Sequence, residues 1–454
     1  MALISKTFAG AGNRKTWTWS AWIKIIADTS KLYTLMTQVD GWSGNSNGGI
    51  YLNGESLQSY NLLANLNSGT SSRVSTTKML RDPSAWYHVV FRFDTTQSTA
   101  SDRVRWYVNG ELQTNLTHNN YPAQNYDANF NTAAAHGIGR HTNGNTYPFE
   151  GIMSHVHFCD GYSYGPDSFG STDSTTGEWK INVSPNVTYG TNGFFILKDG
   201  NSVTDQSGQG NNFAITGSVT KTEDNPSNNF CTGNPLARFA GNVDYTNGNL
   251  TFNSGSGWFM GAGTMGASKG KWYYEYKITT LGTGGGYHKL GFMSDIGIAN
   301  GKAAGHIAEA IVDGSYAFYC QNGNLEVRTD DAVISGYSNG DLGVSFSNGD
   351  IMCVAVDMDN KKAYFRKNGD AWIKSADPVN GTNGLDISSD YPAGKIMIPA
   401  FASYYNGVGS LNFGNGYFGT TAVSSAGTNA SNNGIFEFDV PTGYTALSTK
   451  GLNL

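Results

Sequence analysis

The stretch AWYHVVFRFD, from Ala85 to Asp94, decides the fold because apolar and polar residues alternate along it. One face of such a strand carries Tyr87, Val89, Phe91 and Phe93, and the other carries Trp86, His88 and Arg92. A period of two with one apolar face is the pattern of a sheet that packs on a second sheet. The stretch therefore predicts a β-sandwich.

The next stretch along the chain repeats this pattern. Val104, Trp106 and Val108 lie on one face, and Arg103, Arg105 and Tyr107 lie on the other. Asn109-Gly110 follows, and Asn-Gly is the strongest short-range hairpin signal because both residues tolerate positive φ. Sixteen such pairs punctuate the chain. We therefore predict an all-β protein with two antiparallel β-sandwich (jelly-roll) domains in tandem.

Composition supports large, turn-rich domains. The 454 residues are too many for one ordinary core. Glycine occupies 59 positions, and charged residues make up 14% of the chain against roughly 25% in an average domain. The net charge of -6 offers no basic field for a phosphate backbone, so we expect no nucleic-acid partner.

The cysteines and the N-terminus bear on the compartment. Cys159, Cys231, Cys320 and Cys353 lie far apart with no CxxC pair, which argues against a disulfide framework. The opening residues MALISKTFAGAG show no signal-peptide pattern. No stretch approaches the roughly 18 apolar residues of a membrane span. We expect synthesis in a reducing cytoplasm and no membrane insertion.

A composition shift at EDNPSNNFCTGNP (Glu223–Pro235) marks a domain boundary, because it combines prolines and asparagines without apolar alternation. We predict a first domain at residues 1–222, a linker at 223–235 and a second domain at 236–454. The best helix-like patch is GHIAEAIVD (Gly305–Asp313), which is short enough to be a loop helix.

Four stretches of the first domain match a known pattern: TWTWSAWIK (Thr16–Lys24), AWYHVVFRFD, VRWYVNGE (Val104–Glu111) and FEGIMSHVHFCDG (Phe149–Gly161). They resemble the laminin G-like branch of the concanavalin A-like jelly rolls. In the second domain, GKWYYEYKIT (Gly270–Thr279), KLGF (Lys289–Phe292) and GSLNFGNGYF (Gly409–Phe418) resemble a SPRY domain, a bent β-sandwich that binds partners through rim loops.

The segment between the two domains carries a further resemblance. Phe169–Gly217, which begins FGSTDSTTGEWKINVSPNVTYG, is similar to a family of marine bacteriophage virion proteins that carry this jelly roll. The same family also pairs a jelly roll with a SPRY-like domain. The resemblance implies a virion location, other virion proteins as partners, and a homo-oligomer.

No catalytic pattern accompanies these modules. The nine glutamates are scattered, and none belongs to the E-x-D-x-E-type strand that sets two carboxylates in a cleft. We expect a phage structural protein (tail fibre, appendage or capsid decoration) that binds a host-surface glycan or protein without catalysis. The alternatives are a non-virion carbohydrate-binding adhesin and a polysaccharide hydrolase.

Candidate ligand-binding residues fall into two groups. In the first domain the polar strand faces carry His88, Arg92, Arg103, Arg105 and Tyr107, which predict either a ligand-facing sheet surface or a solvated or subunit-covered one. In the second domain the candidates stand between strand-like runs, and they are Tyr287, His288, Trp372, Tyr404 and Tyr405. Aromatic residues in loops suggest contact with a ligand, and packing is the alternative for each.

Two places are candidate metal sites. His155, His157 and Cys159 alternate on one strand, so a His155–His157 pair with help from another strand predicts a transition-metal site; a covered or solvated face is the alternative. Asp205 opens the turn DQSGQGN and is a candidate calcium ligand, although a single local carboxylate favours an Asx-type turn. No other cofactor is expected.

Overall fold

The computed structural model describes residues 2–25, 32–38, 48–56, 59–65, 72–142, 147–198, 200–240, 245–283, 285–295, 314–321, 324–329 and 332–453. The chain divides into two compact units, Met1–Lys221 with Asn225–Ser227, and Thr222–Asp224 with Asn228–Leu454. The second unit begins earlier than the sequence predicted, because Phe230 and Cys231 are buried in its clusters. The predicted linker at 223–235 is therefore too long. The loop helix predicted at Gly305–Asp313 lies outside the described residues.

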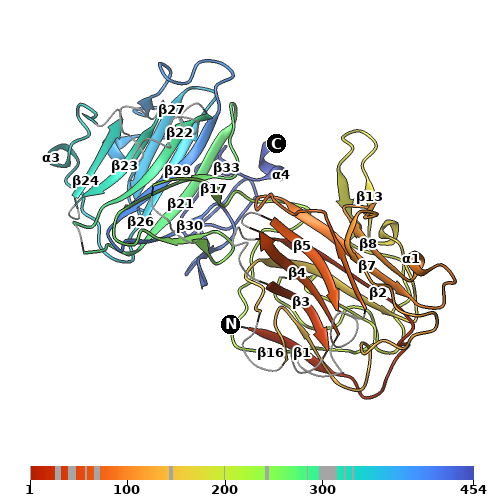
Figure 1. The fold of residues 1–454 in the computed structure, drawn as a ribbon. Helices are drawn as coiled ribbons and strands as arrows, with labels where there is room; N and C mark the ends of the chain where they lie inside the picture. Colours follow the sequence, from red (N-terminus) through yellow and green to blue (C-terminus); the bar gives the residue numbers. More distant parts are fainter. Residues whose placement is uncertain are drawn as a thin grey trace. The chain divides into compact units, whose positions relative to one another are not determined.

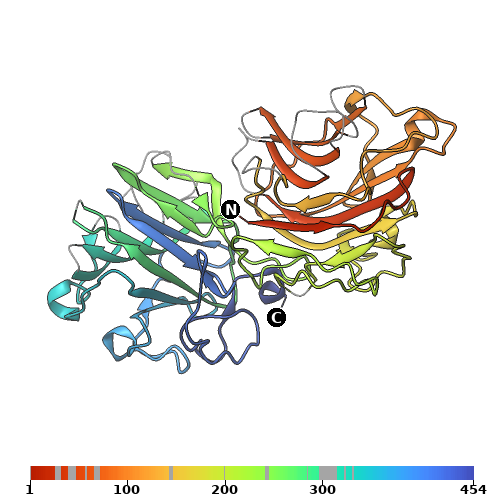
Figure 2. The same ribbon diagram turned by 90° about the horizontal axis from the view of Figure 1, so that it is seen from below.

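The first unit is a sandwich of two antiparallel sheets, which Figure 1 and Figure 2 show as two layers. Sheet I has the strand order β10 (Leu116–Asn119), β6 (Arg73–Thr76), β5 (Ser59–Asn65), β4 (Gly48–Ser56), β3 (Leu32–Gln38), β11 (Ala135–Ile138), β1 (Leu3–Thr7) and β16 (Ala214–Thr216). Sheet II has the order β15 (Phe194–Ile196), β12 (Ile152–Asp160), β2 (Thr16–Lys24), β7 (Trp86–Asp94), β8 (Val104–Val108) and β9 (Glu111–Leu112).

The core of the first unit lies between these sheets, and the predicted alternation places its side chains. Val89, Phe91 and Phe93 of β7 are buried there, with Val104, Trp106 and Val108 of β8. The other elements are the helix α1 (Ala100–Arg103), the turn η1 (Pro166–Ser168) and the hairpin of β13 (Gly170–Thr172) and β14 (Trp179–Ile181). The β-sandwich prediction for these strands is confirmed.

The second unit is also built of two large sheets. Sheet III has the strand order β17 (Gly233–Ala240), β20 (Trp258–Gly263), β29 (Met397–Tyr404), β22 (His288–Ser294), β23 (Tyr316–Gln321), β24 (Asn324–Thr329) and β25 (Ala332–Val333). Sheet IV has the order β18 (Tyr245–Thr246), β19 (Thr251–Asn253), β30 (Val408–Asn412), β21 (Lys271–Thr280), β26 (Ile351–Asp357), β27 (Lys362–Lys367) and β28 (Leu385–Asp386), and β33 (Thr445–Ala446) pairs with β21.

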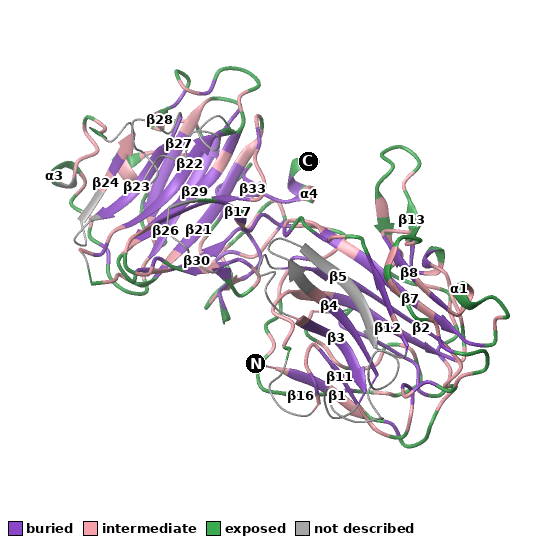
Figure 3. Cartoon of the chain, in the orientation of Figure 1, coloured by how far each residue is buried: buried purple, intermediate pink, exposed green. Residues whose placement is uncertain are grey.

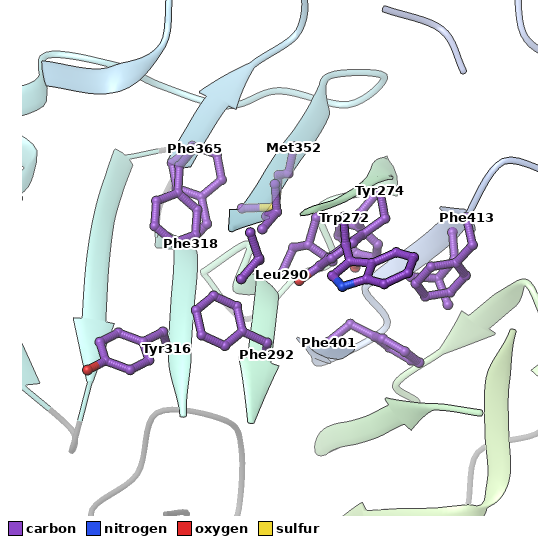
Figure 4. Close-up of a cluster of buried hydrophobic side chains, with 14 of the residues drawn as sticks. Trp272, Tyr274, Leu290, Phe292, Tyr316, Phe318, Met352, Phe365, Phe401 and Phe413 are labelled. Carbon is purple, nitrogen blue, oxygen red and sulfur yellow. The ribbon is translucent and has the colours of Figure 1, made fainter. Parts of the chain in front are cut away.

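Aromatic side chains fill the space between sheets III and IV. Figure 4 shows Trp272 and Tyr274 of β21 beside Leu290 and Phe292 of β22. Short elements complete the unit: β31 (Tyr417–Phe418), β32 (Thr421–Ala422), α3 (Asn339–Leu342), η3 (Ile373–Ser375) and α4 (Thr449–Leu452). The predicted all-β class with antiparallel sheets is confirmed. No helix in the described ranges is long and apolar enough to cross a membrane.

Candidate functional site

The outer face of sheet II, predicted as a polar surface, is covered by the chain's own later residues. His88 is only 1% exposed, and its ring lies between the rings of Trp22 and Trp179, with centroids 5.0 and 5.9 Å away. Figure 3 shows the middle of β2, β7 and β12 buried. The prediction of a ligand-facing surface is therefore wrong at His88.

Hydrogen bonds fix His88 in one neutral form. Its Nδ1 accepts from the Trp179 indole N–H at 3.0 Å, so Nε2 carries the proton and donates to the Ser20 hydroxyl at 2.9 Å. Burial lowers the pKa of His88 to about 3. A protonated ring would turn a second N–H toward the indole N–H, which opposes protonation further.

An apolar cluster lies on the same outer face and contains Tyr107. Its buried members are Val90, Tyr107, Cys159, Phe169, Tyr189 and Phe195. Phe169 and Tyr189 come from the segment that covers the sheet, and the other four come from its strands, so the ligand-facing prediction is also wrong for Tyr107. Burial raises the pKa of the Cys159 thiol, which fits an inert packing role.

The three arginines of this face differ in what they do. Arg103 donates to the main-chain carbonyls of Gln97, Ser98 and Pro122 at 2.9, 2.8 and 2.9 Å, so it fixes two loops and is not a free ligand contact. Arg105 pairs with Asp102, and Arg92 donates to the Ser163 hydroxyl. Arg92 and Arg105 are only partly buried, at the edge of the covered area.

The histidine pair of β12 lies against aromatic rings. A bulge between Ser154 and His157 interrupts the pairing with β2, and His155 has φ 47°. The Phe195 ring lies 4.0 Å from the His157 ring and 5.6 Å from the His155 ring, and the Tyr189 hydroxyl is 2.9 Å from His157 Nδ1. Within the described part of the chain, no three His, Cys, Asp or Glu side chains are grouped to hold a metal ion.

Asp205 has the environment of a turn-forming residue. Its Oδ1 accepts from the main-chain N–H groups of Phe195 and Ser207, both at 2.9 Å. Its Oδ2 accepts from the Ser207 hydroxyl and the Asn211 N–H, both at 2.8 Å. Four donors point at the two oxygens, so the carboxylate is satisfied without a cation, as in an Asx-type turn.

In the second unit, three of the predicted aromatic residues come together. Tyr404 lies directly opposite Trp258 in the pairing of β29 with β20, and their ring centroids are 5.0 Å apart. Tyr287 lies 5.5 Å from Tyr404 and 5.6 Å from Trp258, and Tyr405 lies 5.6 Å from Tyr404. We call Trp258, Tyr287, Tyr404 and Tyr405 the aromatic cluster.

The aromatic cluster is partly open to solvent and rests on a buried cation. Tyr405 is 41% exposed, and the other three rings are half-buried. Lys289 is buried, and its Nζ lies 5.4 Å from the Trp258 ring and 4.5 Å from the Tyr319 ring. Such cation–π contacts hold ring faces in place. Flat rings with hydroxyl edges suit a ligand that has both apolar faces and polar groups.

The loop that carries Tyr405 is fixed by main-chain geometry. Tyr405 and Asn406 have φ 50° and 61°, in the left-handed region. Tyr405 N–H donates to the Gly257 carbonyl at 3.2 Å, and Thr283 N–H donates to the Tyr405 carbonyl at 3.0 Å. Two other segments, around Gly257 and Thr283, therefore hold this loop, so the cluster is largely preformed.

His288 and Trp372 do not belong to the cluster. His288 follows Tyr287 and therefore points to the opposite face of the sheet, where it is buried and bonded to the Tyr276 hydroxyl at 2.6 Å. Trp372 packs on the Arg366 guanidinium, 4.5 Å from its ring, on the outer face of sheet IV. The prediction that His288 contacts a ligand is wrong. Trp258 was missed, although its position just after the Ser-Gly-Ser-Gly sequence is a signal of a strand start.

Glu275 of β21 has a buried carboxyl group that acts as a structural anchor. Burial raises its pKa to about 7. Its oxygens accept from the Tyr273 hydroxyl and Asn412 amide at 3.0 and 3.1 Å, and from the main-chain N–H groups of Glu437 and Phe438 at 2.9 and 3.0 Å. The two main-chain contacts tie the C-terminal segment to sheet IV, and the buried group is inaccessible to a substrate.

Comparisons with known proteins agree with this fold. A family model, Laminin_G_3, described as the concanavalin A-like lectin/glucanases superfamily, matches residues 6–162. This match confirms the predicted concanavalin A-like character of the first unit. No curated protein matches the chain.

Several solved structures resemble parts of the chain. The SPRY domain of human HERC1 is 17% identical, with a TM-score of 0.28 over 39% of this chain and 96% of that domain. The TRIM65 PSpry domain is 9% identical, with a TM-score of 0.27 over 40% of this chain and 91% of that one. A heptameric SAP-like pentraxin from Limulus polyphemus is 15% identical, with a TM-score of 0.29 over 44% of this chain and 87% of that one.

Proposed function

We propose that this protein is a non-catalytic recognition component of a bacteriophage virion, and that it binds host-surface glycans through the aromatic cluster. The observation that carries the binding role is the gathering of Trp258, Tyr287, Tyr404 and Tyr405 into one partly exposed group. Sugar rings have apolar C–H faces and polar edges, and this cluster offers aromatic faces and phenolic hydroxyls to match them. The virion role rests on the resemblance of Phe169–Gly217 to phage virion proteins.

A recognition role also fits the chemistry of the remaining polar groups. Glu275, His88 and His288 have shifted pKa values, and all three are buried with their polar atoms bonded inside the protein. Shifted pKa values often mark catalytic groups, but buried hydrogen-bond networks shift them as well. Here burial accounts for the pKa shift of each of these three groups.

A glycan array tests the binding role, with the full-length chain and the double variant Tyr404→Ala, Tyr405→Ala. We expect the wild type to bind a subset of glycans and the double variant to lose that binding. Analysis of reducing ends in the same samples tests the absence of catalysis. Release of new reducing ends would refute the non-catalytic role, and equal binding by the double variant would refute the cluster as the site.

The virion role needs a separate test. Antibodies against this chain, imaged on purified particles by electron microscopy, are expected to decorate the tail, an appendage or the capsid shell. Particles that carry no copies of the chain would contradict the virion role and leave the adhesin alternative.

A further inference from the structure

Two arginines of the first unit lie directly opposite each other in sheet II. Arg92 of β7 pairs in register with Arg105 of β8, so their side chains leave the same outer face. Directly opposed residues in an antiparallel pair have Cβ atoms about 4.5–5.5 Å apart, and like charges there are destabilising. Two neighbouring guanidinium groups are therefore favourable only with anions close by.

The nearby carboxylates neutralise this pair only in part. Asp102 Oδ1 lies 2.5 Å from Arg105 Nη2. Asp94 is on the same face of β7, but its oxygens accept from the Thr96 hydroxyl at 2.6 Å and the Gln97 amide at 2.7 Å. Those contacts turn Asp94 toward its own loop. Among the described residues, one carboxylate is therefore paired with the two arginines.

The contacts of Arg92 orient it without neutralising it. Its Nε donates to the Ser163 hydroxyl, which is the one protein acceptor that it meets among the described residues. A guanidinium has five N–H donors in a planar fork, so most of the donors of Arg92 remain available. The half-buried side chain has limited access to water to satisfy them.

The segment around Ser163 is itself fixed over the sheet. The Thr18 hydroxyl donates to the Tyr162 carbonyl and accepts from the Tyr164 N–H, both at 2.8 Å. Thr18 is paired with Arg92 in the sheet, so these bonds hold Ser163 beside the guanidinium. The Tyr162 ring, 40% exposed, stacks on the Tyr164 ring at 5.8 Å. Tyr162, whose ring is exposed, thus directly precedes the serine that contacts Arg92.

We propose that Arg92 and Arg105 form an oxyanion site that takes the carboxylate or sulfate group of an acidic polysaccharide. The planar fork of arginine matches either group with paired hydrogen bonds. Tyr162 offers a face for the sugar ring that bears the anion. This site uses no residue of the aromatic cluster, so it stands or falls independently of the proposed glycan binding there.

Affinity electrophoresis of the full-length protein tests the site, with polygalacturonate, dextran sulfate and neutral dextran as probes. We expect one or both acidic polymers to retard the protein, and dextran to retard it less. Arg92→Gln and Arg105→Gln are each expected to weaken acidic-polymer binding about tenfold, as for one lost charge-assisted contact. Arg92→Lys keeps the charge but loses the fork, so it should give an intermediate loss.

Matched controls separate this site from general charge effects and from the loss of any exposed tyrosine. Arg81→Gln removes one positive charge from an exposed position of the same unit and should change binding by less than roughly twofold. Tyr147→Ala, at a 37% exposed tyrosine outside both proposed sites, should leave acidic-polymer binding unchanged. Tighter binding of polygalacturonate assigns a carboxylate, and tighter binding of dextran sulfate assigns a sulfate. Failure of both polymers to bind, wild-type binding by folded Arg92→Gln and Arg105→Gln, or an equal loss in Arg81→Gln would each overturn the proposal.

Discussion

The outer faces of sheets II and III have similar sequence patterns, but their surroundings in the structure differ. On sheet II, His88 and Tyr107 are buried beneath Phe169 and Trp179, which come much later in the chain. On sheet III, Tyr287, Tyr404 and Tyr405 keep part of their surface exposed. Alternation along a strand decides the face of the sheet on which a side chain lies. A distant segment decides whether that face is covered.

Covering the face changes the chemistry of the residues on it. His88 is held neutral by the donor that covers it, and the pKa of His157 is well below its usual value because it is buried. In the aromatic cluster, Tyr405 is 41% exposed, and Tyr287 and Tyr404 are only partly buried. The contrast predicts stability effects on sheet II and binding effects on sheet III.

The largest expected effect is that acid destabilises the first unit more than the second. The pKa values of His88 and His136 are lowered by burial to about 3 and 4. The unfolded state binds a proton on each histidine below about pH 6.5, and the folded state does so only at lower pH. The free energy of unfolding therefore falls as the pH falls, by roughly 3 kcal/mol for each histidine at pH 4. In the second unit, His288 has a pKa of about 4 and acts in the same direction.

Glu275 opposes this loss in the second unit. Its raised pKa means that the folded state takes up a proton first, which adds stability as the pH falls from about 7 to 4.5. Hydrogen exchange of the intact chain in urea, at pH 7 and at pH 4.5, is expected to show β2, β7 and β12 losing protection before β21 and β26. Equal loss in both units, or earlier loss in the second, would contradict the comparison.

The next largest effect concerns the residue that covers the histidines. Phe169 is buried and lies 5.1 Å from the His157 ring and 6.4 Å from the His88 ring. Phe169→Ala is expected to lower the free energy of unfolding by about 3–5 kcal/mol. Urea denaturation measures this loss. Val183→Ala, at an exposed site of the same segment, should stay within about 0.5 kcal/mol of the wild type, and a similarly small loss for Phe169→Ala would show that the cover is dispensable.

Much of the fold could be predicted because it depends on local patterns. The inward faces of β7 and β8 follow directly from period-two alternation, as Phe91 and Trp106 illustrate. The same rule separates Tyr287 from His288, and applying it to the start of β22 would have removed His288 from the candidate list. Asp205 likewise sits in the turn that its own Ser-Gly sequence favours.

The covered face could not be predicted, since it depends on contacts that are remote in sequence. Trp179 is 91 residues from His88 and lies in a polar hairpin whose sequence does not indicate which surface it covers. The aromatic cluster depends in the same way on the order of strands in sheet III, which brings Trp258 of β20 beside Tyr404 of β29. Sequence patterns identified loop aromatics, but they could not say which of them would meet.

A smaller effect is expected from loss of the hydrogen bond between Trp179, which covers the sheet, and His88 of sheet II. Trp179→Phe keeps a ring over Gly110, where any Cβ would lie 2.5 Å from the indole, but removes the N–H that His88 Nδ1 accepts. We expect the free energy of unfolding to fall by about 1–2 kcal/mol, because a buried acceptor loses its donor. The pKa of His88 should rise, since its neutral form loses a partner, and NMR titration of the ring measures this. An unchanged His88 titration would show that burial acts without the indole.

The smallest effect on stability is expected at Tyr405, and this residue gives the most direct test of the difference between the two faces. Because its side chain is 41% exposed, Tyr405→Ala should change the free energy of unfolding by less than about 0.5 kcal/mol. Glycan binding should still weaken about tenfold, because tyrosines at binding sites contribute strongly to affinity. Tyr147→Ala, at a 37% exposed tyrosine of the first unit, serves as the matched control for both measurements. If Tyr405→Ala instead costs as much stability as Phe169→Ala and leaves binding intact, the aromatic cluster has a structural role, as the outer face of sheet II does. The two faces would then differ only in how completely they are covered.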